Sequence, residues 1–432
     1  MSSDSTAEGA PAEAAATSHL GVLATWRQTP RPARALLAGV FVNRLAGFLQ
    51  IFLVLFLTHQ GFSSGQAGLA LGLYGAGSVV GTFVGGWLSD RLSARSVTLI
   101  SMMGSALLLV SILYLRVYPL LLLAVILVGA VSQLYRPAAQ TMITELTPAS
   151  RLVMVTAMYR LCLNLGTTAA PMIGVALVSV SYDLLFWAEA LAALAYGLIA
   201  LVALPRAPRA KPPAGPAPAP EAAPERPPRA GYLALLDDWR YLVFLAAFLL
   251  LCVVYSQYTA VLPLAIVGAG LSTWWYGAVV TINAFIVVTC EMLATRWVQT
   301  WPLRLIQLSG FALLALGYGI YAIDMAPLFL ILGTLVWTLS EILGAPTVYA
   351  YPGLIAPAHL RGRYFGAMQG MFGLGSTLGP ILGILLFEQV GQQVFLWVAA
   401  VAVLATVIGQ VGMRAPRKPD PAPEPAASQP AG

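Results

Sequence analysis

Twelve apolar stretches run along the 432-residue sequence, and each is long enough to cross a lipid bilayer. A membrane-spanning helix needs about 20 mostly apolar residues. The stretches are too long for the strands of a membrane barrel and lack strict alternation, so they predict helices. We expect spans at 34–58, 66–89, 96–117, 118–143, 151–180, 184–204, 239–264, 272–296, 302–323, 326–355, 361–387 and 391–413.

The composition restricts the class of protein further. Only 9% of the residues are charged, against roughly 25% in soluble domains, so the chain lacks the means to cover a water-exposed surface. The net charge of +6 is spread along the chain, which argues against a nucleic-acid partner. The three cysteines and three histidines show no metal-ligand spacing, and there is no phosphate-binding glycine loop. We therefore expect no metal, no cofactor and no enzymatic activity.

Lysine and arginine are distributed very unevenly between the two sides of the predicted spans. Nineteen of the 23 fall in the segments on the side of the N-terminus, and only Arg116 falls in a loop on the other side. Basic loops stay in the cytoplasm. Because the number of spans is even, we expect both termini in the cytoplasm. We expect the chain to lie in the plasma or inner membrane.

A proline-rich segment divides the chain into two halves with six spans each. Ten of the 27 residues of 205–231 are proline, which is typical of a semi-rigid, solvated linker. We expect a disordered cytoplasmic tail at 1–33, a bundle at 34–204, the cytoplasmic linker at 205–231, a second bundle at 232–413 and a disordered cytoplasmic tail at 414–432.

The two halves also resemble each other in sequence. A gapless shift of 209 residues places 134–177 on 343–386 with ten of 44 positions identical, where chance gives about three. The matches include Pro137 with Pro346, Pro148 with Pro357 and Gly166 with Gly375. The sequence thus predicts an all-α integral membrane protein, in which twelve helices form two pseudo-symmetric six-helix bundles around an axis along the membrane normal.

The loop after the second span reads GGWLSDRLSARS, residues 85–96. Asp90 is expected at a helix C-terminus, where the helix dipole disfavours a carboxylate. It therefore needs partners, and the candidates are Arg91, Arg95 and the backbone N–H groups at the start of another helix. A capped, solvated loop is the structural alternative. Gly86 permits close helix packing.

These residues resemble the loop signature of the major facilitator superfamily, G-x-L-x-D-R followed by a basic residue. The matching positions are Gly86, Leu88, Asp90, Arg91 and Arg95, whereas Ser93 and Ala94 depart from the pattern. The resemblance implies that Asp90 docks on the N-terminal end of the eleventh span, near 360–363, and that this contact stabilises an outward-open state.

A glycine-rich stretch in the fifth span, LGTTAAPMIGV at 165–175, resembles the antiporter motif of the same superfamily, and 375–383 in the eleventh span is a closer copy. Small residues four apart let helices approach closely, and proline adds a bend. Ordinary helix packing is the alternative reading. The residues concerned are Gly166, Pro171, Gly174, Gly375, Gly379, Pro380 and Gly383. The layout of 34–413 resembles the twelve-span drug:proton antiporters.

Ionisable side chains within predicted spans need a reason, because each costs ~2.5–3.5 kcal/mol at the centre of a helix. Arginine stays protonated and so does not carry a proton. Glu341, next to the helix-interrupting Pro346, is our first candidate for a proton-coupling acid, and Glu189 is the second. A buried Glu–Arg pair between helices is the structural alternative. Glu291 lies near the inner end of its span, and there Arg296 is the expected partner.

Further polar and aromatic residues within the spans are candidates for a substrate cavity, although each could equally pack in a helix interface. The predicted set is Arg44, Arg136, Arg160, Asn164, Tyr135, Tyr159, Gln257, Asn283 and Trp337, with Asn43, Gln50 and Tyr255 nearby in the sequence.

These observations predict a monomeric, proton-coupled secondary transporter that exports a small amphipathic or drug-like compound by alternating access. Its partners are then a small-molecule substrate, protons and the lipid bilayer. Uptake of an anionic metabolite by symport or facilitated diffusion is the alternative, because three arginines lie within the N-terminal half. A membrane sensor that binds a ligand without moving it is the alternative from another class.

Overall fold

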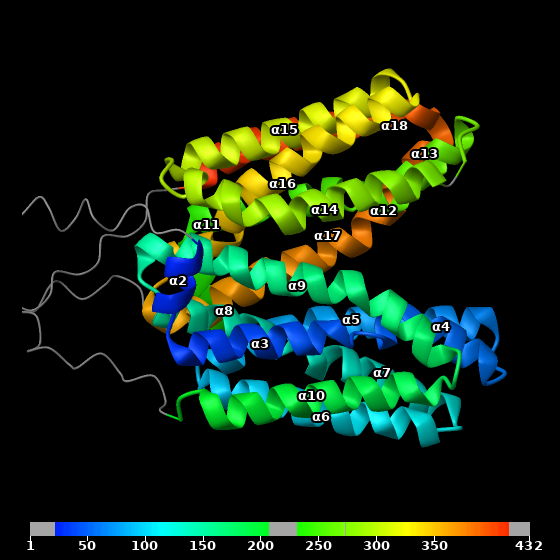
Figure 1. Cartoon of the computed structure of the whole chain (residues 1–432), viewed down its shortest axis with the longest axis vertical. Helices are drawn as coiled ribbons and strands as arrows, with labels where there is room; N and C mark the ends of the chain where they lie inside the picture. The colour runs from blue at the N-terminus through cyan, green and yellow to red at the C-terminus, as the bar shows by residue number, and fades with distance from the viewer. Residues whose placement is uncertain (1–21, 207–230, 273, 414–432) are drawn as a thin grey trace, which may run out of the picture.

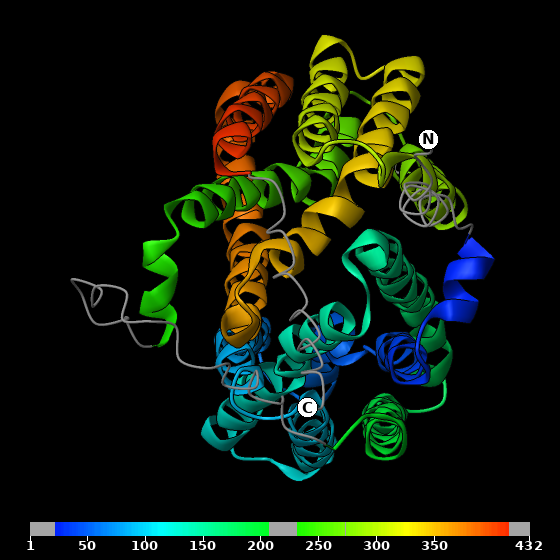
Figure 2. The same ribbon diagram turned by 90° about the vertical axis from the view of Figure 1, so that its left-hand side faces the viewer.

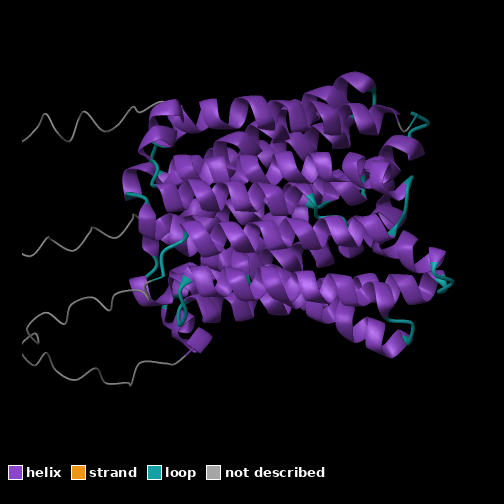
Figure 3. Cartoon of the chain, turned by 60° about the horizontal axis from the view of Figure 1, so that its bottom comes forward, coloured by secondary structure: helices purple, strands orange, loops and turns teal. Residues whose placement is uncertain are grey.

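The computed structural model describes residues 22–206, 231–272 and 274–413. Within these residues the chain is helical throughout, with short connecting loops (Figure 3). The expected tails at 1–21 and 414–432 and most of the linker, 207–230, lie outside the described residues.

The predicted spans agree with the observed helices within a few residues. The first half contains α3 (Arg31–Leu45), α4 (Leu49–His59), α5 (Ser64–Ser89), α6 (Ala94–Tyr114), α7 (Tyr118–Gln133), α8 (Tyr135–Leu146), α9 (Ala149–Val178) and α10 (Asp183–Ala203). The second contains α11 (Trp239–Tyr255), α12 (Gln257–Ala260), α13 (Leu262–Gly268), α14 (Trp274–Val298), α15 (Leu303–Ile323), α16 (Pro327–Ile355), α17 (Arg361–Val390) and α18 (Val394–Gly412). Short helices are α2 (Val22–Gln28), η1 (Gly231–Asp237), η2 (Ala358–Leu360) and η3 (Gly391–Gln393).

The described chain has eleven helical segments apolar and long enough to cross a membrane. The last of them, 358–412, contains both α17 and α18, which are separated where Gly391 adopts a φ of 56°. Three spans are composite: α3 continues into α4, α7 into α8, and α11 into α12 and α13. The expectation of twelve spans is therefore confirmed.

The short helix α2 lies within the segment 1–33, for which we expected a disordered tail. It contacts α9 and α14, and the Arg34 guanidinium lies 5.9 Å from the centre of the Trp26 ring. Thr25 of α2 is buried. This part of the segment therefore packs against the bundle.

The two halves repeat the same helix contacts, as a duplicated fold requires. In the first half α3 packs on α9 and α10, α5 on α7, and α6 on α10. The corresponding helices of the second half make the same pairs: α11 with α17 and α18, α14 with α16, and α15 with α18. Figure 2 shows the two groups of helices as separate bundles. The expected pseudo-symmetric pair of six-helix bundles is confirmed.

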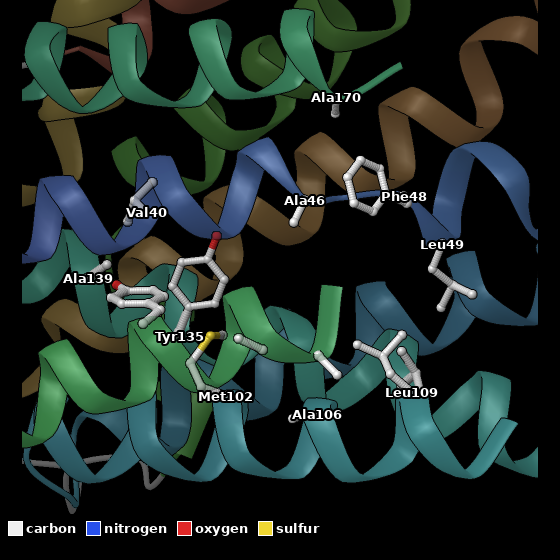
Figure 4. Close-up of a cluster of buried hydrophobic side chains, with 14 of the residues drawn as sticks. Val40, Ala46, Phe48, Leu49, Met102, Ala106, Leu109, Tyr135, Ala139 and Ala170 are labelled. Atoms are coloured by element: carbon white, nitrogen blue, oxygen red, sulfur yellow. The ribbon is translucent and has the colours of Figure 1, made fainter. Parts of the chain in front are cut away.

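Each bundle has its own apolar core. In the first bundle the core includes Val40, Phe48, Met102 and Leu109, and the hydroxyl of Tyr135 points from α8 toward α3 (Figure 4). Close packing and satisfied polar groups, more than exclusion of water, hold such helices together in lipid.

The bundles contact each other mainly through α5 and α8 with α17, and through α9 with α14 and α16. Many of these contacts lie toward the end of the molecule at which the described chain begins and ends, which we name the terminal end. At the opposite end, the far end, α4 of the first bundle and α13 of the second are well separated (Figure 1). The structure is thus closed at the terminal end.

Candidate functional site

Three ionisable side chains from both bundles meet between the helices. Arg160 of α9 donates from Nε to Glu291 Oε1 of α14 at 2.6 Å and from Nη2 to Glu341 Oε1 of α16 at 3.1 Å. The Arg160 side chain is 9% exposed, that of Glu291 0% and that of Glu341 10%. One arginine therefore binds two carboxylates of the other bundle in a nearly water-free place. We name these three residues the ion-pair cluster.

Neighbouring residues of the second bundle hold the ion-pair cluster in place. The Arg160 guanidinium lies 5.0 Å from the centre of the Tyr349 ring, a cation–π distance. Asn283 Nδ2 donates to Glu341 Oε2 at 3.2 Å and to Thr338 Oγ1 at 3.1 Å. Asn283, predicted for the cavity, thus contacts the predicted coupling acid.

Glu291 is the member of the ion-pair cluster that the sequence analysis did not include among the candidate site residues. Its expected partner, Arg296, is exposed, and Glu291 instead pairs with Arg160 of the other bundle. Its second oxygen, Oε2, is buried without a hydrogen-bond partner. The sequence shows that Glu291 is an acid within a span. It does not show that α14 packs against α9, which brings Glu291 to Arg160.

The Asp90 carboxylate binds the N-terminal end of α17, as the family resemblance implied. Oδ1 accepts from the Gly362 N–H at 2.7 Å, Oδ2 accepts from the Arg363 N–H at 3.1 Å, and Arg363 Nε lies 3.5 Å from Oδ2. Backbone N–H groups and the positive end of the helix dipole favour a carboxylate there. Arg91 is exposed and lies over the Trp87 ring at 4.1 Å, while Arg95 is buried in the first turn of α6.

A tyrosine directly after the linker strengthens this contact between α5 and α17. The Tyr232 hydroxyl of η1 donates to the carbonyl of Phe83, next to Gly86 and Gly366, where a β-carbon would meet the hydroxyl. Burial, together with the charge of Asp90, raises the pKa of Tyr232 well above its usual range, so the hydroxyl remains a donor. No sequence pattern pointed to this residue.

The glycines of the two antiporter-like motifs lie against the first helix of their own bundle. A β-carbon on Gly166 would lie 2.6 Å from Arg44 Cβ, and one on Gly174 would meet the Phe52 ring. In α17, Gly375 and Gly379 face Cys252 and Ser256 of the seventh span, and Gly383 faces Gln257. Pro171 and Pro380 lie inside α9 and α17.

The other predicted cavity residues fall into separate places. Arg44 and Glu189 line a cavity within the first bundle, and Glu189 binds the backbone of Phe48 and Leu49. The Nε atoms of Arg44 and Arg136 are buried without a hydrogen-bond partner. Tyr135 and Tyr159 are buried with unpartnered hydroxyl groups. Asn164 lies one turn beyond Arg160 on α9 and is half-buried.

Two of the predicted residues pack within the second bundle instead of facing the ion-pair cluster directly. Gln257 Nε2 donates to the Gly379 carbonyl at 2.8 Å and so links the seventh and eleventh spans. Trp337 is buried, donates from Nε1 to the Tyr321 hydroxyl at 2.8 Å, and packs against Tyr255 and Tyr258. Among the described residues, no group of three or more His, Cys, Asp or Glu could hold a metal ion.

Two pseudo-symmetric helical bundles, joined by the buried ion-pair cluster and by the contact of the Asp90 carboxylate with α17 at the terminal end, have the architecture of a membrane carrier. The sequence profile described as Major Facilitator Superfamily matches residues 36–371 and 276–432. The chain belongs to this superfamily, and it is a transporter and not an enzyme.

Relatives and solved structures agree with this family. The uncharacterized MFS-type transporter YqjV of Bacillus subtilis (strain 168) is 22% identical over 391 residues, which cover 89% of this chain and 93% of YqjV. A Na(+), Li(+), K(+)/H(+) antiporter of Planococcus maritimus is 23% identical, with 79% of this chain and 86% of that protein covered.

The similar structures share the fold at low sequence identity. The human organic anion transporter MFSD10 superposes with a TM-score of 0.70 at 18% identity, covering 88% of this chain and 98% of that one. The transporter FucP in its outward conformation gives a TM-score of 0.67 at 16% identity, covering 89% and 99%.

Proposed function

We propose that the protein is a proton-coupled antiporter that exports a small amphipathic or drug-like compound by alternating access. The observation that carries this proposal is the binding of Arg160 to Glu291 and Glu341 across the two bundles. The relative named as a cation/proton antiporter supports proton exchange. In this proposal the terminal end is cytoplasmic, the chain acts as a monomer in the cell membrane, and 34–204 and 232–413 move against each other.

Glu341 is the proton-coupling acid in this proposal. It is the more exposed of the two acids in the ion-pair cluster, so water reaches it more readily than Glu291. A proton on Glu341 removes one charge from the pair with Arg160 and leaves Glu291 as the remaining partner. The contact between bundles then weakens, which favours opening of the terminal end, and a cationic cargo competes with the proton for the same carboxylate.

Transport by the purified protein in liposomes tests the role of Glu341. Glu341→Gln should bind ethidium, a fluorescent amphipathic cation, yet fail to move it in response to an imposed pH gradient. Glu388→Gln is the matched control, because it makes the same chemical change at an exposed position of α17. If Glu341→Gln responds to the gradient as the unchanged protein does, Glu341 is not the coupling acid.

Transport of an organic anion is a second candidate function. The buried Nε atoms of Arg44 and Arg136 lack partners, and a structurally similar protein is named as an organic anion transporter. The same liposomes, loaded with a fluorescent carboxylate dye, distinguish the two candidates. Movement of the dye without movement of ethidium would favour the anion, and Arg136→Gln should then abolish it.

A further inference from the structure

The first span is interrupted in the middle of its length, although no proline lies there. Helix α3 ends at Leu45 and α4 begins at Leu49, with Ala46, Gly47 and Phe48 between them. The amides at the start of α4 have no carbonyl of their own helix to bind. Lipid offers no replacement, so the protein itself must supply an acceptor.

Glu189 of α10 supplies that acceptor. Its Oε2 accepts from the Phe48 N–H at 2.9 Å and from the Leu49 N–H at 2.6 Å. Bonds from N–H groups to a carboxylate are shorter and roughly twice as strong as neutral ones. The Phe48 N–H also donates to the Ala46 carbonyl at 3.0 Å. The interruption, which we name the joint, is therefore bridged by a charged side chain from another helix.

A polar cavity inside the first bundle reaches Glu189. Its volume is about 40 Å³, which is enough for a few water molecules. It is lined by Asn43, Arg44, Gly47, Gln50, Tyr74, Ser105, Leu109, Val128, Ser132, Gln133, Glu189 and Ala193. Gln50 is exposed, so the lining continues to the surface.

Few charged or titratable groups face Glu189 in this cavity. Arg44 of α3 and Tyr74 of α5 interact with it electrostatically, while α6 and α7 contribute the uncharged Ser105, Ser132 and Gln133. Gln133 is 9% exposed and its Oε1 has no hydrogen-bond partner. A carboxylate beside a cavity with room for water is suited to bind a proton.

We infer that the first bundle holds a second proton-binding site, Glu189, separate from the ion-pair cluster, and that a proton bound there releases the joint. A protonated Glu189 is neutral, and it then lacks the charge that strengthens its hydrogen bonds from the Phe48 and Leu49 N–H groups. Helix α9 packs on both sides of the joint, with Gly166 against Arg44 and Gly174 against Phe52. Because α9 also carries Arg160, movement of the joint shifts the ion-pair cluster; this coupling, but not proton binding itself, rests on the proposed function.

Hydrogen–deuterium exchange of the purified full chain tests the site. The measured quantity is the protection factor of the peptide covering 46–52, corrected for the pH dependence of intrinsic exchange. We expect it to fall about tenfold from about pH 8 to about pH 5, because a neutral acid forms weaker bonds. Glu189→Gln should give low protection at both pH values. Glu189→Asp should restore a pH-dependent fall.

Two controls separate this site from the ion-pair cluster and from unfolding. Glu388→Gln and Glu341→Gln should both keep the fall in protection, so failure of Glu341 as the coupling acid leaves this result unaffected. Peptides from α15 should be protected equally in all variants, which shows that the fold is kept. A flat profile in the unchanged protein, or an unchanged fall in Glu189→Gln, overturns the inference.

Discussion

Arg160 of the first bundle contacts three residues of the second bundle. It neutralises one carboxylate charge of Glu291 and Glu341 and lies against Tyr349. A buried ion pair is weak evidence for stability, but removal of one partner leaves an uncompensated charge and costs much more. With two acids and one arginine, a single proton balances the charges of the ion-pair cluster.

Replacement of Arg160 by methionine should lower stability in a pH-dependent manner. The expected loss is about 3–5 kcal/mol where both acids are charged. The loss should shrink as the pH falls, because protonation of Glu291 and Glu341 removes the unpaired charges. Thermal unfolding in detergent across pH measures it. The triple variant Arg160→Met, Glu291→Gln, Glu341→Gln should regain much of the stability. A loss that does not depend on pH would contradict this account.

At the scale of helices, glycines determine how closely the first and fifth spans approach. A β-carbon on Gly166 would lie 2.9 Å from the Leu45 backbone nitrogen and closer still to Arg44 Cβ. Backbone does not yield as the end of a flexible side chain does, so the helices must separate. The structure shows the same relation in the second bundle, between Gly375 and Cys252.

Gly166→Ala should therefore destabilise the first bundle by about 1–3 kcal/mol through overpacking. Gly319→Ala on α15 is the matched control, because no atom lies within 4 Å of its added β-carbon. There alanine should be neutral or should stabilise the helix by up to about 1 kcal/mol. Equal unfolding temperatures for the two variants would show that the close approach at Gly166 has no energetic consequence.

The existence and length of the helices were predictable from the sequence, but their interruptions were not. The expectation that Pro346 interrupts its helix was wrong, because α16 continues through Pro346 and Pro352 to Ile355. The long apolar runs require helices, since only helices satisfy every backbone group within a lipid-facing segment. No proline lies at the break at 46–48, so the sequence does not predict it. Glu189, about 140 positions later in the chain, accepts hydrogen bonds from the amides at this break.

For the whole molecule, we propose that the contact of Asp90 with α17 favours the state that is closed at the terminal end. Asp90 accepts two backbone hydrogen bonds across the bundles, and Tyr232 packs beside it on Phe83. Any interaction present in only one of two states biases their equilibrium by its own free energy. In the same proposal the ion-pair cluster, which also joins the two bundles, favours that state too.

Asp90→Asn should shift the population toward the state that is open at the terminal end. An amide retains the shape but loses the charge, and we expect a change of about 1–2 kcal/mol, about a five- to thirtyfold change in the ratio of states. Distances between spin labels at the terminal ends of α5 and α17 measure it. Asp324→Asn, in an exposed loop, should leave the distances unchanged; unchanged distances in Asp90→Asn would exclude the latch.

The sequence by itself determined the class of fold, the twelve spans, the internal repeat and the Asp90 motif, because these follow from local chain properties that lipid and helix geometry impose. It also marked Arg160 and Glu341 as unusual. Only the tertiary structure decided that Arg160 binds Glu291 together with Glu341 and that Glu189 holds the first span. The reason is that the partner of a buried charge depends on which helices lie side by side, and almost uniformly apolar helix surfaces do not encode their neighbours in any short stretch of sequence.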